Sequence, residues 1–256
     1  MDCWRSATPP RRPPSSNSVT AVIAAAGSGQ RLGAGGPKAF VPLAGRPMVE
    51  WSIEACREAG SVRSIVAVCP PGHVDELAGH DIGVVEGGAT RAQSVANALR
   101  SVDTELVAIH DAARPLVTSE LIDDVVATLV ADPAAAGAIA ATPVTDTIKQ
   151  VADGDRPRRN ALRLPGDQKT LHLVERTLDR ERLWAAQTPQ VFRVGVLCDA
   201  LGGDPDGVAA ATDEAMLIEA AGGKVLIHPS PPENFKVTTP RDLRLAEALL
   251  AERSAQ

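Results

Sequence analysis

The chain has 256 residues, enough for one large α/β domain or for one domain with an added arm. Hydrophobic residues make up 44% of the chain and charged residues 23%, as in ordinary soluble proteins, and the net charge of −6 excludes a general attraction to nucleic acid or acidic membranes. Apolar runs stay well short of the ~18 residues of a membrane span, so the sequence predicts a cytoplasmic protein without nucleic-acid or membrane partners.

The first 18 residues differ in composition from the rest of the chain. They contain several prolines, arginines and serines, a mixture that cannot bury enough apolar surface to fold. We expect residues 1–18 to form a disordered extension and residues 19–256 to form a single domain. The four cysteines have neither C-x-x-C spacing nor a regular period, which argues against a disulfide framework or a zinc site and is typical of reduced thiols.

A glycine-rich loop follows the first predicted strand. Residues 21–24 form a short apolar run, and the segment after it places Arg31 and Lys38 among five glycines. Glycines bring backbone N–H groups close to a ligand, and the two cations supply the charge that phosphates require. The loop is not a P-loop, because Pro37 rather than glycine precedes Lys38, and Leu32 breaks the dinucleotide-binding fingerprint. The loop therefore predicts a triphosphate site, with a plain surface turn as the alternative.

Apolar strands and amphipathic helices then alternate along the chain. Strands are expected over residues 64–69, 82–85, 106–109 and 136–141, and helices from Pro47, around residues 92–102 and from Thr118 or Ser119. This alternation is typical of an α/β protein with a doubly wound, mostly parallel, Rossmann-like sheet. In such sheets ligands bind beyond the carboxyl ends of the strands, so the loops at 27–38, 87–91 and 111–114 should meet at one edge.

The alternation stops between about residues 142 and 184. This segment is rich in charges and turn residues and has weak hydrophobic periodicity. We interpret it as a β-arm that protrudes from the sheet, and because an isolated hairpin is marginally stable, the arm predicts a homodimer. Residues 188–192 are then expected to be extended, and residues 234–237 to form a strand that carries Lys236 to the sheet edge.

Seven blocks of the chain resemble one known family. They are AAAGSGQRLGAGGPK, GGATRAQSV, HDAARP, TPVTDTIK, QTPQVF, ATDEA and ENFKVTTPRDL, in this order, over roughly residues 20–250. The blocks look like those of 2-C-methyl-D-erythritol 4-phosphate cytidylyltransferases, enzymes of the non-mevalonate route to isoprenoid precursors. The resemblance implies that CMP passes from CTP to methylerythritol phosphate with Mg²⁺, giving 4-diphosphocytidyl-2-C-methyl-D-erythritol and pyrophosphate. A cytidylyltransferase for another polyol phosphate, such as ribitol 5-phosphate, is the alternative.

The resemblance also implies roles for single residues. The catalytic cations are Arg31, Lys38 and Lys236, and the positions around the nucleotide are Ala25, Ala26, Gly27, Gly29, Gly88 and Ser94. Contacts to the acceptor substrate are implied for Asp111, Arg114, Thr147, Arg180, Thr188 and Thr238, with Asp111 also as metal ligand and with Arg176 or Arg182 as alternatives to Arg180. Arg91 is expected to support its loop, and Asp213 and Glu214 to lie near the metal or to orient Lys236.

Overall fold

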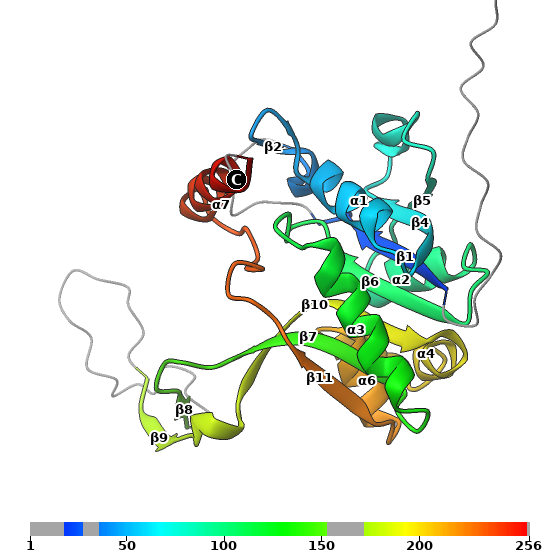
Figure 1. The fold of residues 1–256 in the computed structure, drawn as a ribbon. Coiled ribbons are helices and arrows are strands. Elements are labelled where there is room, and N and C mark those ends of the chain that lie inside the picture. The colour runs from blue at the N-terminus through cyan, green and yellow to red at the C-terminus, as the bar shows by residue number, and fades with distance from the viewer. Residues whose placement is uncertain (1–17, 28–35, 153–171, 255–256) are drawn as a thin grey trace, which may run out of the picture.

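The computed structural model describes residues 18–27, 36–152 and 172–254, so the predicted extension, apart from Ser18, lies outside the described residues. The centre of the fold is a seven-stranded sheet with strand order β11-β7-β10-β6-β1-β4-β5 (Figure 1). In chain order its strands are β1 (Val19–Ala24), β4 (Val62–Cys69), β5 (Gly83–Glu86), β6 (Leu106–Asp111), β7 (Gly137–Pro143), β10 (Trp184–Arg193) and β11 (Val225–Pro229). Neighbouring strands are parallel except where β10 pairs with β6 and β7. The predicted mostly parallel α/β sheet is confirmed.

Helices cover both faces of this sheet. They are α1 (Met48–Glu58), α2 (Arg91–Leu99), α3 (Ser119–Ala131), α4 (Val194–Leu201), α5 (Pro205–Ala210), α6 (Glu214–Ala220) and α7 (Pro240–Ser254), with short 3-10 helices at Lys38–Phe40, Val74–Leu77 and Arg180–Arg182. Helices α1 and α3 pack in one core with Ile23, whereas α2, α4 and α6 pack in another with Val22, because neighbouring strand residues face opposite sides. No helix in the described part of the chain is long and apolar enough to cross a membrane.

The carboxyl ends of four parallel strands meet at one edge of the sheet. The register pairs Ala24, at the end of β1, with Val68 on β4 and with Asp111 at the end of β6. Strand β5 ends beside β4, where Glu86 lies opposite Cys69. The loops that follow β1, β5 and β6 therefore begin side by side, which is the arrangement that favours a ligand site.

A two-stranded arm stands away from the main sheet (Figure 1). It consists of β8 (Lys149–Val151) and β9 (Val174–Thr177), which pair antiparallel and lie in the chain between β7 and β10. The predicted β-arm is thus confirmed. A second small pair, β2 (Pro42–Leu43) and β3 (Arg46–Pro47), precedes α1.

Residues 234–237 do not form the predicted strand. The segment is irregular, and the Val237 N–H group donates to the Ala113 carbonyl in the loop after β6. The buried Asn234 side chain donates to three oxygen atoms of neighbouring segments, and these bonds fix the backbone without a strand ladder. Lys236 nevertheless reaches the predicted edge of the sheet.

Candidate active site

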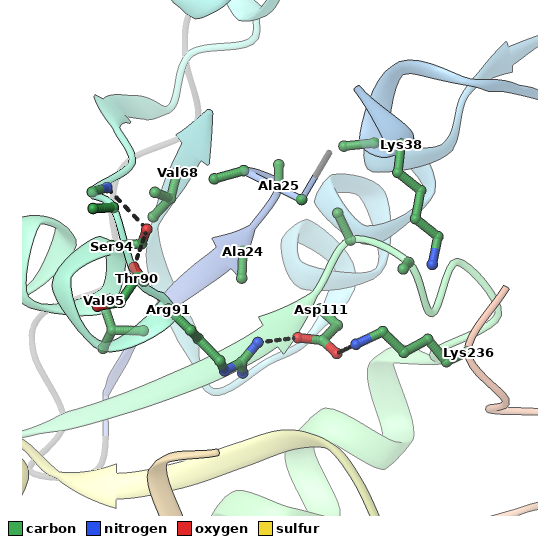
Figure 2. A pocket seen from close by; sticks show the side chains of 17 residues that line it. Ala24, Ala25, Lys38, Val68, Thr90, Arg91, Ser94, Val95, Asp111 and Lys236 are labelled. Carbon is green, nitrogen blue, oxygen red and sulfur yellow. Dashed lines mark hydrogen bonds and ion pairs between the residues drawn. The ribbon is translucent and has the colours of Figure 1, made fainter. Parts of the chain in front are cut away.

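A pocket of about 290 Å³ opens at this edge (Figure 2). One half is built of backbone and small side chains, and the other half carries charge. The small residues include Ala25, Ala26, Gly27, Gly88 and Ser94, and the charged residues are Lys38, Arg91, Asp111 and Lys236. This division suits a ligand with a flat ring at one end and phosphates at the other.

The small half depends on a close approach between two loops. A Cβ atom on Gly87 would lie 2.7 Å from the Cβ of Ala26, so a larger residue at position 87 would push the loops apart. The Ser94 hydroxyl accepts the Gly88 N–H at 3.0 Å and donates to the Thr90 carbonyl at 2.9 Å. Ser94 is buried, and its hydroxyl therefore fixes the loop after β5 as a wall of the pocket.

The start of α2 fixes the same loop from its other end. Thr90 caps the helix, because its hydroxyl accepts the Gln93 N–H at 3.1 Å, and the Gln93 side-chain oxygen accepts the Ala89 N–H at 2.9 Å. These reciprocal bonds resemble a capping box. The pattern T-x-x-Q in the sequence is the signal for this cap, and neither Thr90 nor Gln93 is among the predicted site residues.

Four side chains of alternating charge form a chain at the charged half of the pocket, and three of them, Lys236, Asp111 and Arg91, line it. Asp111 Oδ2 accepts a hydrogen bond from Lys236 Nζ at 2.6 Å, and Oδ1 accepts one from Arg91 Nη1 at 2.6 Å. Arg91 also donates from Nε and Nη2 to the two carboxylate oxygens of Glu214, at 3.1 and 3.0 Å. Figure 2 shows Arg91 and Lys236 on opposite sides of Asp111, with the Lys38 ammonium group directed to the same part of the pocket.

Burial and neighbouring charges set the ionisation of these groups. Burial alone would raise the pKa of Asp111, but the charges of Arg91 and Lys236 outweigh it and hold the pKa well below its usual range. For Arg91 the loss of solvent is outweighed by the two carboxylates, which raise its pKa. Burial raises the pKa of Glu214, and the Arg91 guanidinium opposes this rise. Asp111 is therefore an anion, and Arg91 a cation, throughout the neutral pH range.

A buried chain of hydrogen bonds fixes the backbone of Asp111. The Thr188 hydroxyl accepts the Asp111 N–H at 3.0 Å and lies 3.1 Å from Nδ1 of His110. His110 Nε2 lies 3.2 Å from the Arg114 carbonyl, and since a carbonyl only accepts, Nε2 carries the proton and Nδ1 accepts from the hydroxyl. Burial lowers the pKa of His110 to about 4, so the imidazole is neutral and serves as a link in the chain.

The Arg114 side chain lies behind the pocket. It is buried and donates from Nη1 to the Asn234 carbonyl at 2.7 Å and from Nη2 to the Ala186 carbonyl at 3.4 Å. These bonds join the loop after β6 to β10 and to the segment that carries Lys236. In the described part of the chain, Arg114 is not among the residues that line the pocket, so the structure places it as a support for Lys236.

The predicted residues of the arm lie apart from the pocket of the single chain. Thr147 is exposed just before β8, and Arg180 donates to the backbone carbonyl of Thr145 at 2.5 Å. Arg176 donates to the Gln150 side chain across the hairpin at 2.8 Å. Within the described ranges, none of these side chains lines the pocket.

The remaining predicted residues fall into two groups. Gly29 and Arg31 lie outside the described residues. Thr238 contacts the start of α7, where its hydroxyl donates to Asp242 at 2.7 Å. Asp213 and Glu214 are both expected near the metal or Lys236. Asp213 instead caps α6 by accepting the N–H of Met216. Glu214 is linked to Asp111 and Lys236 through Arg91.

A doubly wound sheet whose carboxyl edge carries a pocket with a small-residue half and a charged half is the arrangement of a nucleotide-binding enzyme. The sequence profile of one family, IspD or 2-C-methyl-D-erythritol 4-phosphate cytidylyltransferase, matches residues 19–252, and the chain belongs to this family. Membership makes it a cytidylyltransferase of non-mevalonate isoprenoid biosynthesis, as the sequence blocks predicted.

Individual relatives agree with this assignment. The 2-C-methyl-D-erythritol 4-phosphate cytidylyltransferase of Frankia casuarinae is 44% identical over 247 residues, which cover 94% of this chain and 84% of the relative. The protein of the same name from Rubrobacter xylanophilus is 41% identical over 243 residues, with 92% and 96% covered. The crystal structure of the Thermus thermophilus protein of that name superposes with a TM-score of 0.71 at 32% identity, covering 91% of this chain and 99% of that one.

Proposed function

We propose that this chain transfers CMP from CTP to 2-C-methyl-D-erythritol 4-phosphate with Mg²⁺, and that Lys38, Asp111 and Lys236 form the centre that handles the phosphates. The observation that carries the proposal is that these three residues line one pocket at the carboxyl edge of the sheet, in a chain of this family. Two ammonium groups beside a buried carboxylate suit a triphosphate with a divalent cation. Residues 19–256 act as one domain in this proposal.

The chemistry requires positioning and charge stabilisation more than acid–base catalysis. An oxygen of the acceptor phosphate attacks the α-phosphorus of CTP, and the bond to the bridging oxygen of the β-phosphate breaks as pyrophosphate leaves. The attacking oxygen is already anionic, so no general base is needed, and the neutral, buried His110 is free for its structural role. Lys38 and Lys236 stabilise the charge on the phosphates, with Lys236 at the α-phosphate and Arg31 as a further cation.

Asp111 is the residue that would hold the magnesium ion. Mg²⁺ in nucleotide enzymes takes one or two carboxylates together with phosphate oxygens and waters. Within the described ranges no group of three or more His, Cys, Asp or Glu could hold a metal by itself, so a single ionised carboxylate fits a metal that arrives with the triphosphate. When bound, the ion neutralises charge on the phosphate oxygens.

The small half of the pocket is proposed to hold cytosine. Its walls are backbone and small side chains, from Ala25, Ala26, Gly27, Gly88 and Ser94. Gly29 is proposed to contact the nucleotide on the basis of the family resemblance alone. Backbone N–H and C=O groups can recognise the edge of a pyrimidine ring, and the close packing of Gly87 against Ala26 holds the two loops that carry these groups together.

The arm is proposed to complete the acceptor site of a second subunit in a homodimer. Val151, Leu173 and Val174 of the arm are 44%, 72% and 51% exposed, an apolar surface that an isolated hairpin cannot bury. In such a dimer Thr147 and Arg180 would contact the acceptor bound to the neighbouring chain. Thr188, Arg114 and Thr238 act on the acceptor side by fixing Asp111 and the segment around Lys236.

The direct test measures pyrophosphate release from CTP and Mg²⁺, with methylerythritol phosphate and ribitol 5-phosphate as acceptors in parallel reactions. Release with methylerythritol phosphate alone is the expected result. Release with ribitol 5-phosphate alone would refute methylerythritol phosphate as the acceptor, but it would agree with the proposed roles of the lysines. Absence of release with either acceptor would refute the proposed reaction.

A further inference from the structure

We infer that Glu214 is a positioning residue: by holding Arg91 on Oδ1 of Asp111, it makes Lys236 the exchangeable cation of the two that contact this carboxylate. The inference rests on the proposed function, since it concerns how Asp111 and Lys236 become available to the incoming nucleotide. Glu214 itself does not line the pocket in the described structure and acts through Arg91.

The two cations on Asp111 are held very differently. Arg91 makes three charge-assisted hydrogen bonds to two carboxylates, and its side chain is 27% exposed. Lys236 makes one such bond, at 2.6 Å, and its side chain is 42% exposed. A bidentate guanidinium–carboxylate pair has fixed geometry, whereas an ammonium group on a flexible stem moves at small cost. Lys236 is therefore the partner that leaves Asp111 more readily.

The charged partner of the Glu214 carboxylate is Arg91, which donates to both of its oxygen atoms. Its side chain is 2% exposed, and a buried carboxylate is costly unless it is paired and hydrogen-bonded. Asp213, the preceding residue, fixes the start of α6 by accepting the Met216 N–H and a hydrogen bond from Gln190, each at 3.0 Å. The carboxylate of Glu214 thus presents a fixed target that ties α2 to α6 through Arg91.

This arrangement determines what happens when CTP enters. The triphosphate attracts Lys236 away from Oδ2 of Asp111, while Arg91 stays on Oδ1, so one oxygen of the carboxylate is freed in a defined orientation. The two cations Arg91 and Lys236 and the two anions Asp111 and Glu214 together have no net charge. Without the charge of Glu214, their net charge becomes +1. Arg91 is then free to turn to the triphosphate, and Lys236 remains paired with Asp111. The nucleotide would bind more tightly, and the reaction would be slower.

The test compares Glu214→Gln with Glu219→Gln, which removes the same charge from an exposed position of the same helix. Isothermal titration with CTP and Mg²⁺, without acceptor, gives the dissociation constant, and pyrophosphate release with both substrates gives kcat. We expect Glu214→Gln to bind CTP about 3- to 10-fold more tightly, as for one added charge in a partly solvated pocket, and kcat to fall about 10- to 100-fold. Glu219→Gln should match the wild type in both measurements. Weaker CTP binding by Glu214→Gln, or wild-type turnover, would overturn the inference.

A double variant covers the case in which Glu214→Gln does not fold. Arg91→Met combined with Glu214→Met removes both partners and leaves no unpaired buried charge. It should lose turnover to a similar extent without the gain in CTP affinity expected of Glu214→Gln, and wild-type turnover would overturn the inference. If the wild type and Glu219→Gln bind CTP but release no pyrophosphate, the proposed function fails, whereas the comparison of CTP affinities still tests the role of Glu214.

Discussion

Replacing Thr188 with valine tests the buried chain that fixes Asp111. Valine keeps the shape of threonine and removes the hydroxyl, which accepts the Asp111 N–H at 3.0 Å and donates to His110 Nδ1 over 3.1 Å. Thr188 is 4% exposed, so water cannot replace the lost group without opening the structure. The substitution therefore leaves one buried donor and one buried acceptor without their partner.

The expected loss follows from these two groups. Each buried polar group that loses its partner costs about 1–3 kcal/mol, so Thr188→Val, which affects two such groups, should lower the free energy of unfolding by about 2–6 kcal/mol. The control is Thr188→Ser, which keeps the hydroxyl and loses one buried methyl group, at a cost of about 1 kcal/mol. Turnover should also fall in Thr188→Val, because the backbone of Asp111 loses its anchor.

Urea unfolding of the wild type, Thr188→Val and Thr188→Ser measures their free energies of unfolding. Equal slopes of free energy against urea concentration would verify that the three proteins expose the same surface on unfolding. Pyrophosphate release measured on the same samples reports the effect on Asp111. The reasoning is refuted if Thr188→Val unfolds within about 0.5 kcal/mol of the wild type, a difference ordinary for neutral substitutions. It is also refuted if Thr188→Ser is the less stable of the two variants.

Three further substitutions probe the charge, the buried imidazole and the sheet. Lys236→Ala should lower turnover about 10²- to 10³-fold in the pyrophosphate assay, because a cation at the transition state is lost. His110 has a pKa of about 4 when folded and ~6.5 when unfolded, so the unfolded chain binds the proton first. Stability is then fully present above about pH 6.5 and falls by up to ~3 kcal/mol as the pH is lowered towards 4, and urea midpoints should show a flatter pH profile for His110→Gln. In Gly137→Ala the new Cβ would lie 2.4 Å from a ring carbon of Phe192, and overpacking should cost about 1–3 kcal/mol in thermal unfolding.

Control variants show whether these losses come from the named contacts or from any substitution of the same kind. Lys224→Ala removes a surface cation that pairs with Asp132 and should leave turnover unchanged. Gly195→Ala, inside α4, adds a Cβ that meets no atom within 4 Å beyond its chain neighbours and the backbone of its own helix. It should keep or raise the melting temperature. Equal losses in a variant and its control would contradict the corresponding argument, as would a pH profile of His110→Gln identical to that of the wild type.

The local patterns of the sequence determined most of the fold. Apolar runs such as residues 64–69 and 106–109 became β4 and β6, because a buried parallel strand needs a short continuous apolar segment. Their alternation with amphipathic helices implied parallel strands, and parallel strands bring the loops with Lys38 and Asp111 to one edge. The family blocks indicated the reaction, because each block is a short continuous segment that can be recognised without knowing the fold.

The contacts between distant segments were decided by the tertiary structure. The bond between Arg91 and Glu214 joins residues 123 positions apart, and the position of Thr188 behind Asp111 depends on β10 pairing antiparallel with β6. The strand expected at residues 234–237 is absent because the backbone there bonds to loop and side-chain groups rather than to a neighbouring strand. The Val237 N–H donates to the Ala113 carbonyl, and the Asn234 carbonyl accepts from Arg114. Local periodicity specifies which residues face the core, but not which buried polar groups find one another. That pairing depends on how the helices and strands pack in three dimensions.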